Sequence, residues 1–168
     1  KTLLAIWRLQ AVIEAGKRAL YVCFNTKLAE ILRWRYPEHA SCIVSVDKFF
    51  TGMCPDLRCG ADTSKFFRET LPAAALDVAA GYAEVAKYDA IIVDEGQDFS
   101  EFQLYALNEL LRLDESEWII FTDRRQDLFQ MRSGDTFGAE VIFKLYHNCR
   151  NTQRVNDATN SYLGKQWI

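Results

Sequence analysis

Short, uninterrupted apolar runs recur along this chain, and two of them end directly in acidic residues. The runs cover residues 19–24 (ALYVCF), 42–46, 90–93 (AIIV), 117–122 (EWIIFT) and 141–145. A strand with one face in water alternates apolar and polar residues, whereas a continuously apolar strand is covered on both faces. Runs of this kind separated by helical patterns predict an α/β fold in which helices flank a parallel sheet.

Helical patterns occupy the intervals between these runs. They cover residues 2–15, 27–35 after a capping Asn25-Thr26 pair, 47–50, 65–70, 73–85, 100–113 and a last helix from 151 or 152 to about 162. The first is apolar almost all round, which predicts a helix buried on most sides, with Trp7 in the core. Trp118 is expected in the core as well, and Trp34 at a partly exposed helix end. Residues 51–87 combine turn formers with two short helices around Pro72 and predict a short helical insertion.

Length and charge limit the function classes. A chain of 168 residues allows one domain. Its 20 Lys and Arg against 23 Asp and Glu leave a formal charge of −3, so a contact with nucleic acid would have to be local. No apolar stretch is long enough for a membrane span. Five cysteines, an odd number outside any regular framework, favour reduced thiols and a cytoplasmic protein.

Acidic residues follow two of the apolar runs. Asp94 and Glu95 end the third run, and Asp123 ends the fourth. In parallel sheets ligands bind at the carboxyl ends of the strands, and adjacent carboxylates there suit a magnesium and phosphate site. The alternative is an ordinary surface turn after a core strand. Lys1-Thr2, just before a buried helix, looks like the end of a G-x-x-x-x-G-K-[ST] phosphate loop, although this dipeptide is common by chance.

The order of several sequence blocks resembles the UvrD/Rep/PcrA-type superfamily 1 DNA helicases over nearly the whole chain. Lys1-Thr2 is similar to the end of motif I, FNTKLAEILR (24–33) to motif Ia and SVDKFF (45–50) to motif Ib. VDEGQDF (93–99) is similar to motif II, TDRRQDLF (122–129) to motif III and HNCRNT (147–152) to motif IV. The resemblance implies the first RecA-like domain of a P-loop NTPase that uses ATP and Mg²⁺.

The resemblance also implies roles in ATP hydrolysis. Lys1 would bind the β and γ phosphates, Thr2 and Asp94 would hold Mg²⁺, and Asp123 would lie beside the nucleotide. Glu95 would be the general base, Gln126 the γ-phosphate sensor and Arg150 an arginine finger, which in phosphoryl transfer contributes roughly 10³ to 10⁵ in rate. A solvated arginine at a helix start is the alternative interpretation of Arg150.

A second set of residues is implied to contact DNA. Phe24, Asn25, Thr26 and Phe129 would contact single-stranded or partly duplex DNA, with Lys27 near its backbone. Stacking of bases on aromatic rings is worth roughly 1 to 3 kcal/mol per base. Phe24 and Phe129 fit equally well as core residues.

Several positions depart from the family pattern. Gly96 replaces the usual Ala of motif II, Thr122 replaces a Gly, Asp47 replaces a His, and Met131 stands where a stacking ring is usual. The segment between motifs Ib and II is also short. These departures favour slightly a nucleotide-binding regulatory switch without processive unwinding, and an RNA-directed relative is a third interpretation.

The chain is expected to supply only one wall of a catalytic cleft. The resemblance places a glycine-rich loop before Lys1 and a second RecA-like domain after Ile168, so we expect the 168 residues alone to hydrolyse little or no ATP. A zinc site at Cys54 and Cys59 is an alternative use of the C-x₄-C pair, but it would need two more ligands nearby.

Overall fold

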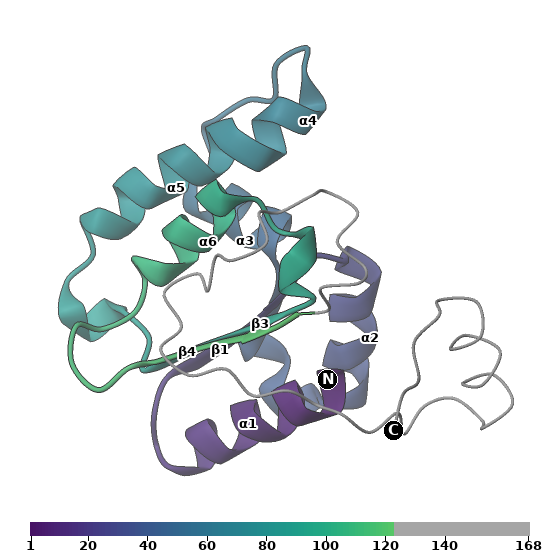
Figure 1. Cartoon of the computed structure of the whole chain (residues 1–168), viewed down its shortest axis with the longest axis vertical. Helices are drawn as coiled ribbons and strands as arrows, with labels where there is room; N and C mark the ends of the chain where they lie inside the picture. Colours follow the sequence, from purple (N-terminus) through teal and green to yellow (C-terminus); the bar gives the residue numbers. More distant parts are fainter. Residues whose placement is uncertain (123–168) are drawn as a thin grey trace, which may run out of the picture.

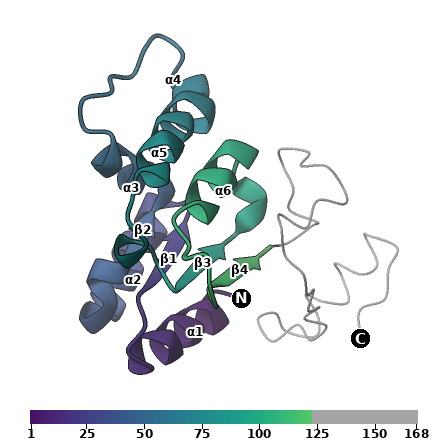
Figure 2. The same cartoon turned by 90° about the vertical axis from the view of Figure 1, so that its left-hand side faces the viewer.

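A four-stranded parallel sheet forms the centre of the molecule. A computed structural model describes residues 1–122 of the chain. Figure 1 shows the sheet among its helices. Its strands are β1 (Ala19–Cys23), β2 (Ile43–Ser45), β3 (Ala90–Asp94) and β4 (Glu117–Phe121), in the order β2-β1-β3-β4 (Figure 2). The α/β class and four predicted strands are confirmed. The predicted strand at 141–145 and the last helix lie outside the described residues.

The continuous apolar runs are explained by cover on both faces of this sheet. Leu20, Val22, Ile91 and Val93 point into one hydrophobic cluster, whereas Ala19, Tyr21, Cys23, Ala90 and Ile92 point into another. Helices lie on both sides of the strands (Figure 2). Alternate residues of β1 and β3 therefore face different layers, and both sets are buried.

Two helices cover the face that carries Tyr21. Helix α1 (Thr2–Glu14) buries Ala5, Ile6, Leu9 and Val12, and α2 (Thr26–Arg35) buries Ala29 and Leu32. The prediction that the first helix is buried on most sides is wrong, because its buried residues form one stripe. Trp7 lies off that stripe and is 60% exposed, so its predicted place in the core is wrong too. Trp34 is exposed, and Trp118 is packed partly buried against the core.

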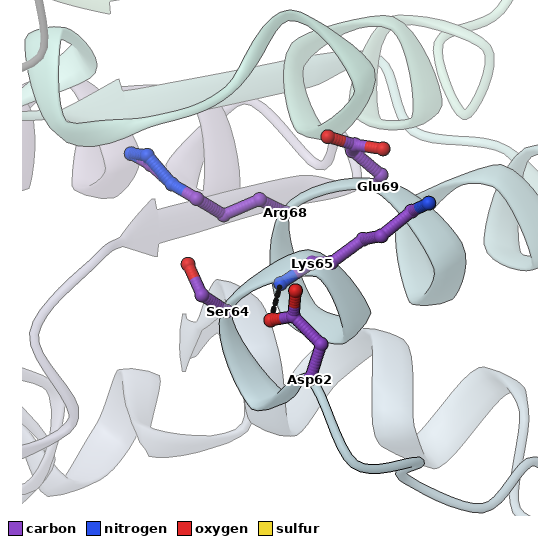
Figure 3. Close-up of a pocket in the computed structure, with 5 residues that line it drawn as sticks. All are labelled: Asp62, Ser64, Lys65, Arg68 and Glu69. Atoms are coloured by element: carbon purple, nitrogen blue, oxygen red, sulfur yellow. Dashed lines mark hydrogen bonds between the residues drawn. The ribbon is translucent and has the colours of Figure 1, made fainter.

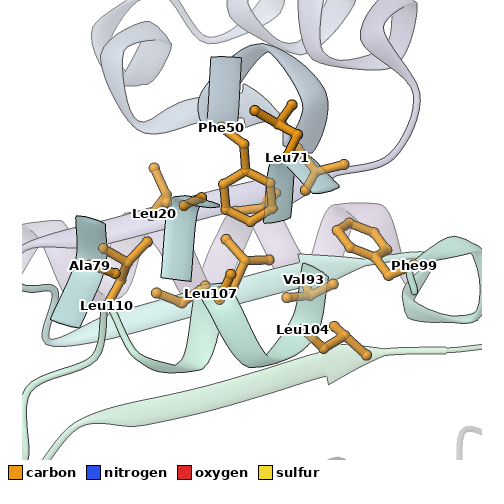
Figure 4. Close-up of a cluster of buried hydrophobic side chains, with 14 of the residues drawn as sticks. Leu20, Phe50, Leu71, Ala79, Val93, Phe99, Leu104, Leu107 and Leu110 are labelled. Carbon is orange, nitrogen blue, oxygen red and sulfur yellow. The ribbon is translucent and has the colours of Figure 1, made fainter. Parts of the chain in front are cut away.

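Three helices cover the opposite face. They are α3 (Val46–Met53), α5 (Leu71–Ala80) and α6 (Glu101–Asn108). Phe50 of α3, Leu71 and Ala79 of α5 and Leu107 of α6 converge on the strands (Figure 4). Burial of such side chains contributes roughly 1.5 to 3 kcal/mol each before entropy is counted. The helical segment between the second and third strands therefore supplies part of the core on this face, and α6 supplies another part.

That segment is more continuous than the sequence suggested. Helix α4 (Thr63–Lys65) runs into a π-helical turn (Phe66–Thr70) and then into α5. Pro72 was expected to separate two helices, but it lies in the first turn of α5, where its missing N–H is tolerated. A 3₁₀ turn (Glu84–Ala86) ends the segment. A second 3₁₀ helix (Pro37–Cys42) leads into β2.

Two elements differ from their predicted extent or burial. Helix α6 begins after a Ser100 capping box, at its predicted start, but ends at Asn108 rather than at 113, and its Phe102 and Tyr105 side chains are exposed. Strand β4 was expected to be fully buried, yet all five of its residues are only half-buried. Within the described ranges, none of the helices is long and apolar enough to cross a membrane.

Candidate functional site

The start of α1 and the end of β3 meet at the carboxyl edge of the sheet. Lys1 Nζ lies 3.5 Å from Glu95 Oε2, although 94 residues separate them in sequence. Their side chains remain 24% and 28% exposed, so this ion pair borders solvent. The first backbone amides of α1 lie in the same region. They form the positive end of the helix dipole. A cation, backbone amides and a carboxylate thus lie together at this edge of the sheet.

Asp94 lies behind this pair and is fully buried. The Tyr21 hydroxyl donates a hydrogen bond to Asp94 Oδ2 at 2.7 Å, and the Glu95 amide donates to Oδ1 at 3.1 Å. Burial, with the Asp94 charge as a second cause, raises the pKa of Tyr21 well above its usual range, so the phenol stays a donor. These two bonds fix the orientation of the carboxylate at the end of β3.

Glu95 has a strained backbone. Its φ of 56° lies in the left-handed region, which costs a non-glycine residue on the order of 1 to 3 kcal/mol. Gln97 Nε2 donates to Glu95 Oε2 at 2.9 Å, and Thr122 Oγ1 donates to Gln97 Oε1 at 3.4 Å. Two side-chain donors, Lys1 and Gln97, therefore hold the carboxylate, and Gln97 also contacts the end of β4.

Gly96 allows this loop to lie close against β4. A Cβ atom built at Gly96 would clash with Ile120 Cγ2, so a side chain fits there only if Ile120 or the loop shifts. Gly96 begins a 3₁₀ turn (Gly96–Asp98) that brings Gln97 to Thr122. Gly96, which stands where the helicase pattern usually has alanine, thus leaves room for Ile120 on the neighbouring strand.

The expected nucleic-acid contacts within the described residues, Phe24 to Lys27, lie at the start of α2. Asn25 caps the helix through Oδ1, which accepts from the amides of Lys27 and Leu28. Thr26 Oγ1 donates to Ser45 Oγ at 3.2 Å and ties α2 to the end of β2. The Phe24 ring is half-buried and packs edge-on against Phe99, with centroids 6.0 Å apart. Lys27 is exposed and pairs with Glu30 at 2.9 Å.

Asp47 belongs to a polar network inside the helical layer. Gln103, which is fully buried, donates from Nε2 to the Phe67 carbonyl and to Asp47 Oδ1. Arg68 in the π turn donates to the Asp98 carbonyl at 3.1 Å. Burial raises the pKa of Asp47, and the Arg68 cation opposes that shift. Where the family pattern has a histidine, this chain therefore has an acid held inward by an amide partner and a nearby guanidinium.

A shallow hollow on the insertion lies near Arg68. Its volume is about 320 Å³, and it is lined by Asp62, Ser64, Lys65, Arg68 and Glu69. Asp62 Oδ1 accepts the Lys65 amide at 2.9 Å, while the Arg68 head group extends to the side opposite the Lys65 side chain (Figure 3). Acids and cations of the wall are equal in number, and the one hydrogen bond drawn caps the local turn. We assign this hollow no function.

Only part of the implied magnesium site is accessible. Thr2 is half-buried beside the ion pair, and Asp94 has no surface exposed to solvent. Both oxygens of Asp94 accept hydrogen bonds inside the protein, so Asp94 could act on an ion beside Thr2 only through its charge. Among residues 1–122 no three His, Cys, Asp or Glu side chains form a metal-binding group, at Cys54 and Cys59 or elsewhere. Burial raises the pKa of Cys23, at the end of β1, to about 12, so its thiol is not a nucleophile.

Sequence reasoning missed three residues that shape the site. In the sequence Tyr21 is one residue of a continuous apolar run, and Gln97 is part of an acidic turn. Arg68 is one charged residue in a helical pattern that was expected to be exposed. Tyr21 and Asp94 occupy alternate positions of β1 and β3 that face the same side of the sheet. This alternation is the one sequence pattern from which their contact could have been predicted. Four predicted residues lie outside the described part of the chain, namely Asp123, Gln126, Phe129 and Arg150.

Comparison with known proteins found no match to this chain. The chain matches no family model, no curated protein and no solved structure. What is established is an α/β fold with a four-stranded parallel sheet flanked by helices, in which a lysine, a strained glutamate and a buried aspartate converge at the carboxyl edge.

Proposed function

We propose that this chain is a RecA-like nucleotide-binding domain that takes Mg²⁺ and ATP at the carboxyl edge of its sheet, as part of a superfamily 1 type DNA helicase. The observation that carries the proposal is the contact between Lys1 and Glu95 in front of the buried Asp94. The order of the sequence blocks is the second support. Each alone has an ordinary structural explanation, but the two together favour a phosphate site because the contact joins the block at Lys1 to the block at Asp94.

The residues divide the chemistry between them. Lys1 and the first amides of α1 would bind the terminal phosphates, and Thr2 would hold the metal ion, with the buried charge of Asp94 behind it. The ion would neutralise charge on the phosphate oxygens. Glu95 Oε2 already accepts from Lys1 and Gln97. Its Oε1 is the oxygen suited to take a proton from water as that water attacks the γ phosphorus and ADP leaves.

Binding of a fluorescent ATP analogue to the 168-residue chain, with and without Mg²⁺, tests the proposal. We expect Lys1→Ala to weaken binding at least tenfold and Glu95→Gln to leave binding in place, because Glu95 acts on water. Lys17→Ala is the matched control, since Lys17 is an exposed lysine just beyond the other end of α1. Equal affinity of the wild-type, Lys1→Ala and Lys17→Ala chains would refute the site.

Hydrolysis separates the motor from the regulatory switch. We expect the 168 residues alone to bind nucleotide but turn over little ATP, because the proposed helicase hydrolyses ATP between two domains. In a longer protein that contains this chain, ATPase stimulated by single-stranded DNA and lost in Glu95→Gln would support the helicase. Nucleotide binding that DNA does not affect would support the switch, and stronger stimulation by RNA would support the RNA-directed relative.

A further inference from the structure

A groove with an apolar floor runs beside the edge strand β2. It has a volume of about 360 Å³, within the range of roughly 300 to 1,000 Å³ typical of ligand pockets. Val44 of β2, Phe49 and Met53 of α3 and Tyr82 after α5 form its apolar part. Helix α2, strand β2 and helix α3 lie along one side of the molecule, where this groove is found (Figure 2).

Helix α3 presents one face to the groove. Lys48, Phe49, Gly52 and Met53 follow the spacing i, i+1, i+4 and i+5, which places them on a single face of a helix. Asp47 lies on the opposite face, where it is bound by Gln103. The acid that precedes Lys48 therefore does not neutralise the groove.

Cations border the apolar floor. Arg33 Nε donates to the Ile43 carbonyl at 2.6 Å, which fixes the guanidinium at the rim, and its two Nη atoms receive no partner among residues 1–122. Lys48 Nζ contacts Glu30 at 3.1 Å, and Glu30 also contacts Lys27 at 2.9 Å. Three cations against one carboxylate leave a local charge of +2 on a chain whose total is −3.

The groove continues the surface at the start of α2. Lys27 stands in the first turn of that helix, and the shared carboxylate of Glu30 links it to Lys48 at the groove rim. A ligand that follows these cations passes from the capped end of α2 onto Phe49 and Tyr82. Alternating anionic groups and flat apolar groups are what such a surface accommodates.

We propose that this groove binds single-stranded nucleic acid, with one base against Phe49 and Tyr82 and the flanking phosphates on Lys27, Arg33 and Lys48. Rings with adjacent cations are the stacking platform and electrostatic track of proteins that bind single strands. The proposal rests on the nucleic-acid part of the proposed function and extends it beyond the residues of the first turn of α2.

Gly52 offers a way to block the groove without damage to the fold. It lies in α3 and lines the groove, and a Cβ atom added there would meet no other atom within 4 Å. Leucine is a better helix former than glycine, so Gly52→Leu should fold at least as well as the wild type. Gly60→Leu is the matched control, because Gly60 is equally open and does not line the groove.

The experiment measures binding of a fluorescein-labelled dT12 oligonucleotide to the whole chain by anisotropy, at salt concentrations from about 50 to about 200 mM, where phosphate contacts change the affinity steeply. We expect Gly52→Leu and Tyr82→Ala to weaken binding at least about fivefold. Lys48→Gln should lower the affinity and reduce the salt slope by about 0.7. Gly60→Leu and Lys65→Gln should change neither quantity, and circular dichroism checks the fold of each variant.

The outcomes separate this proposal from the proposed function. Binding of dT12 that Gly52→Leu and Lys48→Gln leave intact overturns the groove, even if Mg²⁺ and ATP bind as proposed. Loss of groove-dependent binding in these variants supports it, even if the chain binds no ATP. Complete absence of dT12 binding overturns it. Displacement of dT12 by poly-glutamate as readily as by unlabelled dT12 also overturns it, in favour of an acidic peptide ligand.

Discussion

The two ends of the sheet are both rich in charge, but they use it differently. At the amino end Asp89 accepts the Arg18 amide at 2.7 Å and Arg112 Nη1 at 2.6 Å. Lys87 is buried between Glu84 and Glu109, and the Arg18 guanidinium lies 5.1 Å from the centre of the Tyr88 ring. Each of these interactions holds a loop against the start of a strand.

At the carboxyl end the charges stay close to solvent and to one another. Lys1 and Glu95 border solvent at 3.5 Å, Glu95 has a left-handed backbone, and Asp94 is fixed by Tyr21. Strained residues and partly exposed ion pairs persist where the surrounding structure holds them, and they concentrate at functional sites. A partly exposed pair, Arg8–Glu117, and a left-handed residue, Glu115, also occur at the amino end. The two ends differ in that the exposed pair at the carboxyl end lies in front of a fully buried acid.

The largest effect on stability is expected at the amino end. Asp89→Ala removes the acceptor of both Arg18 and Arg112, so we expect the free energy of unfolding in urea to fall by about 2 to 3 kcal/mol. Binding of Mg²⁺ and ATP should persist at temperatures where the variant is folded. Asp114→Ala, an exposed acid in a turn, is the control. If the Asp89→Ala chain were stable but had lost nucleotide binding, the amino end would be the binding end and the carboxyl end would not.

A smaller effect is expected where the carboxyl loop meets β4. Gly96→Ala places a methyl group against Ile120 Cγ2, and overpacking of this kind costs about 1 to 3 kcal/mol. Ile120→Ala should relieve the contact, so the double variant should be more stable than the sum of the two changes predicts. Gly52→Ala, in open space on α3, should be neutral or stabilising. Additive effects of Gly96→Ala and Ile120→Ala would contradict the close approach of loop and strand.

The bond behind the ion pair should matter less for stability. Tyr21→Phe deletes a buried donor to Asp94, and we expect a loss of about 1 to 2 kcal/mol measured by urea unfolding. Tyr105→Phe, at an exposed tyrosine of α6, should have no effect. If Tyr21→Phe left stability unchanged, Asp94 would have found another donor, and its fixed orientation would no longer distinguish the carboxyl end.

The smallest effect is a pH dependence at Asp47. Burial raises the pKa of this carboxyl, so the folded state binds a proton more tightly than the unfolded state. Stability attributable to this group therefore falls as pH rises from its ordinary pKa of about 3.9 through the raised value. Asp47→Asn keeps an oxygen for Gln103 and should be more stable than the wild type at pH 7 by less than about 1 kcal/mol.

Unfolding curves at pH 3 and pH 7 check this prediction. The advantage of Asp47→Asn should shrink at pH 3, where the wild-type carboxyl is protonated in both states. An advantage of equal size at both values would mean that charge is not its cause. Asp56→Asn, at an exposed turn, should show no difference at either pH.

The sequence by itself determined the sheet and its helical cover. Continuous apolar runs at 19–24 and 90–93 predicted doubly covered parallel strands because a strand with one face in water usually alternates apolar and polar residues. The same pattern at 117–122 belongs to a strand that is only half-buried. Asn25 and Ser100 marked helix starts because their side chains replace missing backbone acceptors. Lys1, Thr2, Asp94 and Glu95 were identified from motif order, and the fold brings Lys1 to Glu95.

Only the tertiary structure decided which side chains are buried and which are paired. Trp7 has the composition of a core residue, yet the helix around it turns another stripe toward the sheet. Tyr21 and Asp94 are 73 residues apart and become partners because parallel pairing aligns their strands. Gly96 is required by Ile120, a residue on another strand. Local patterns set which elements form, whereas contacts distant in sequence depend on register and packing that no local pattern encodes.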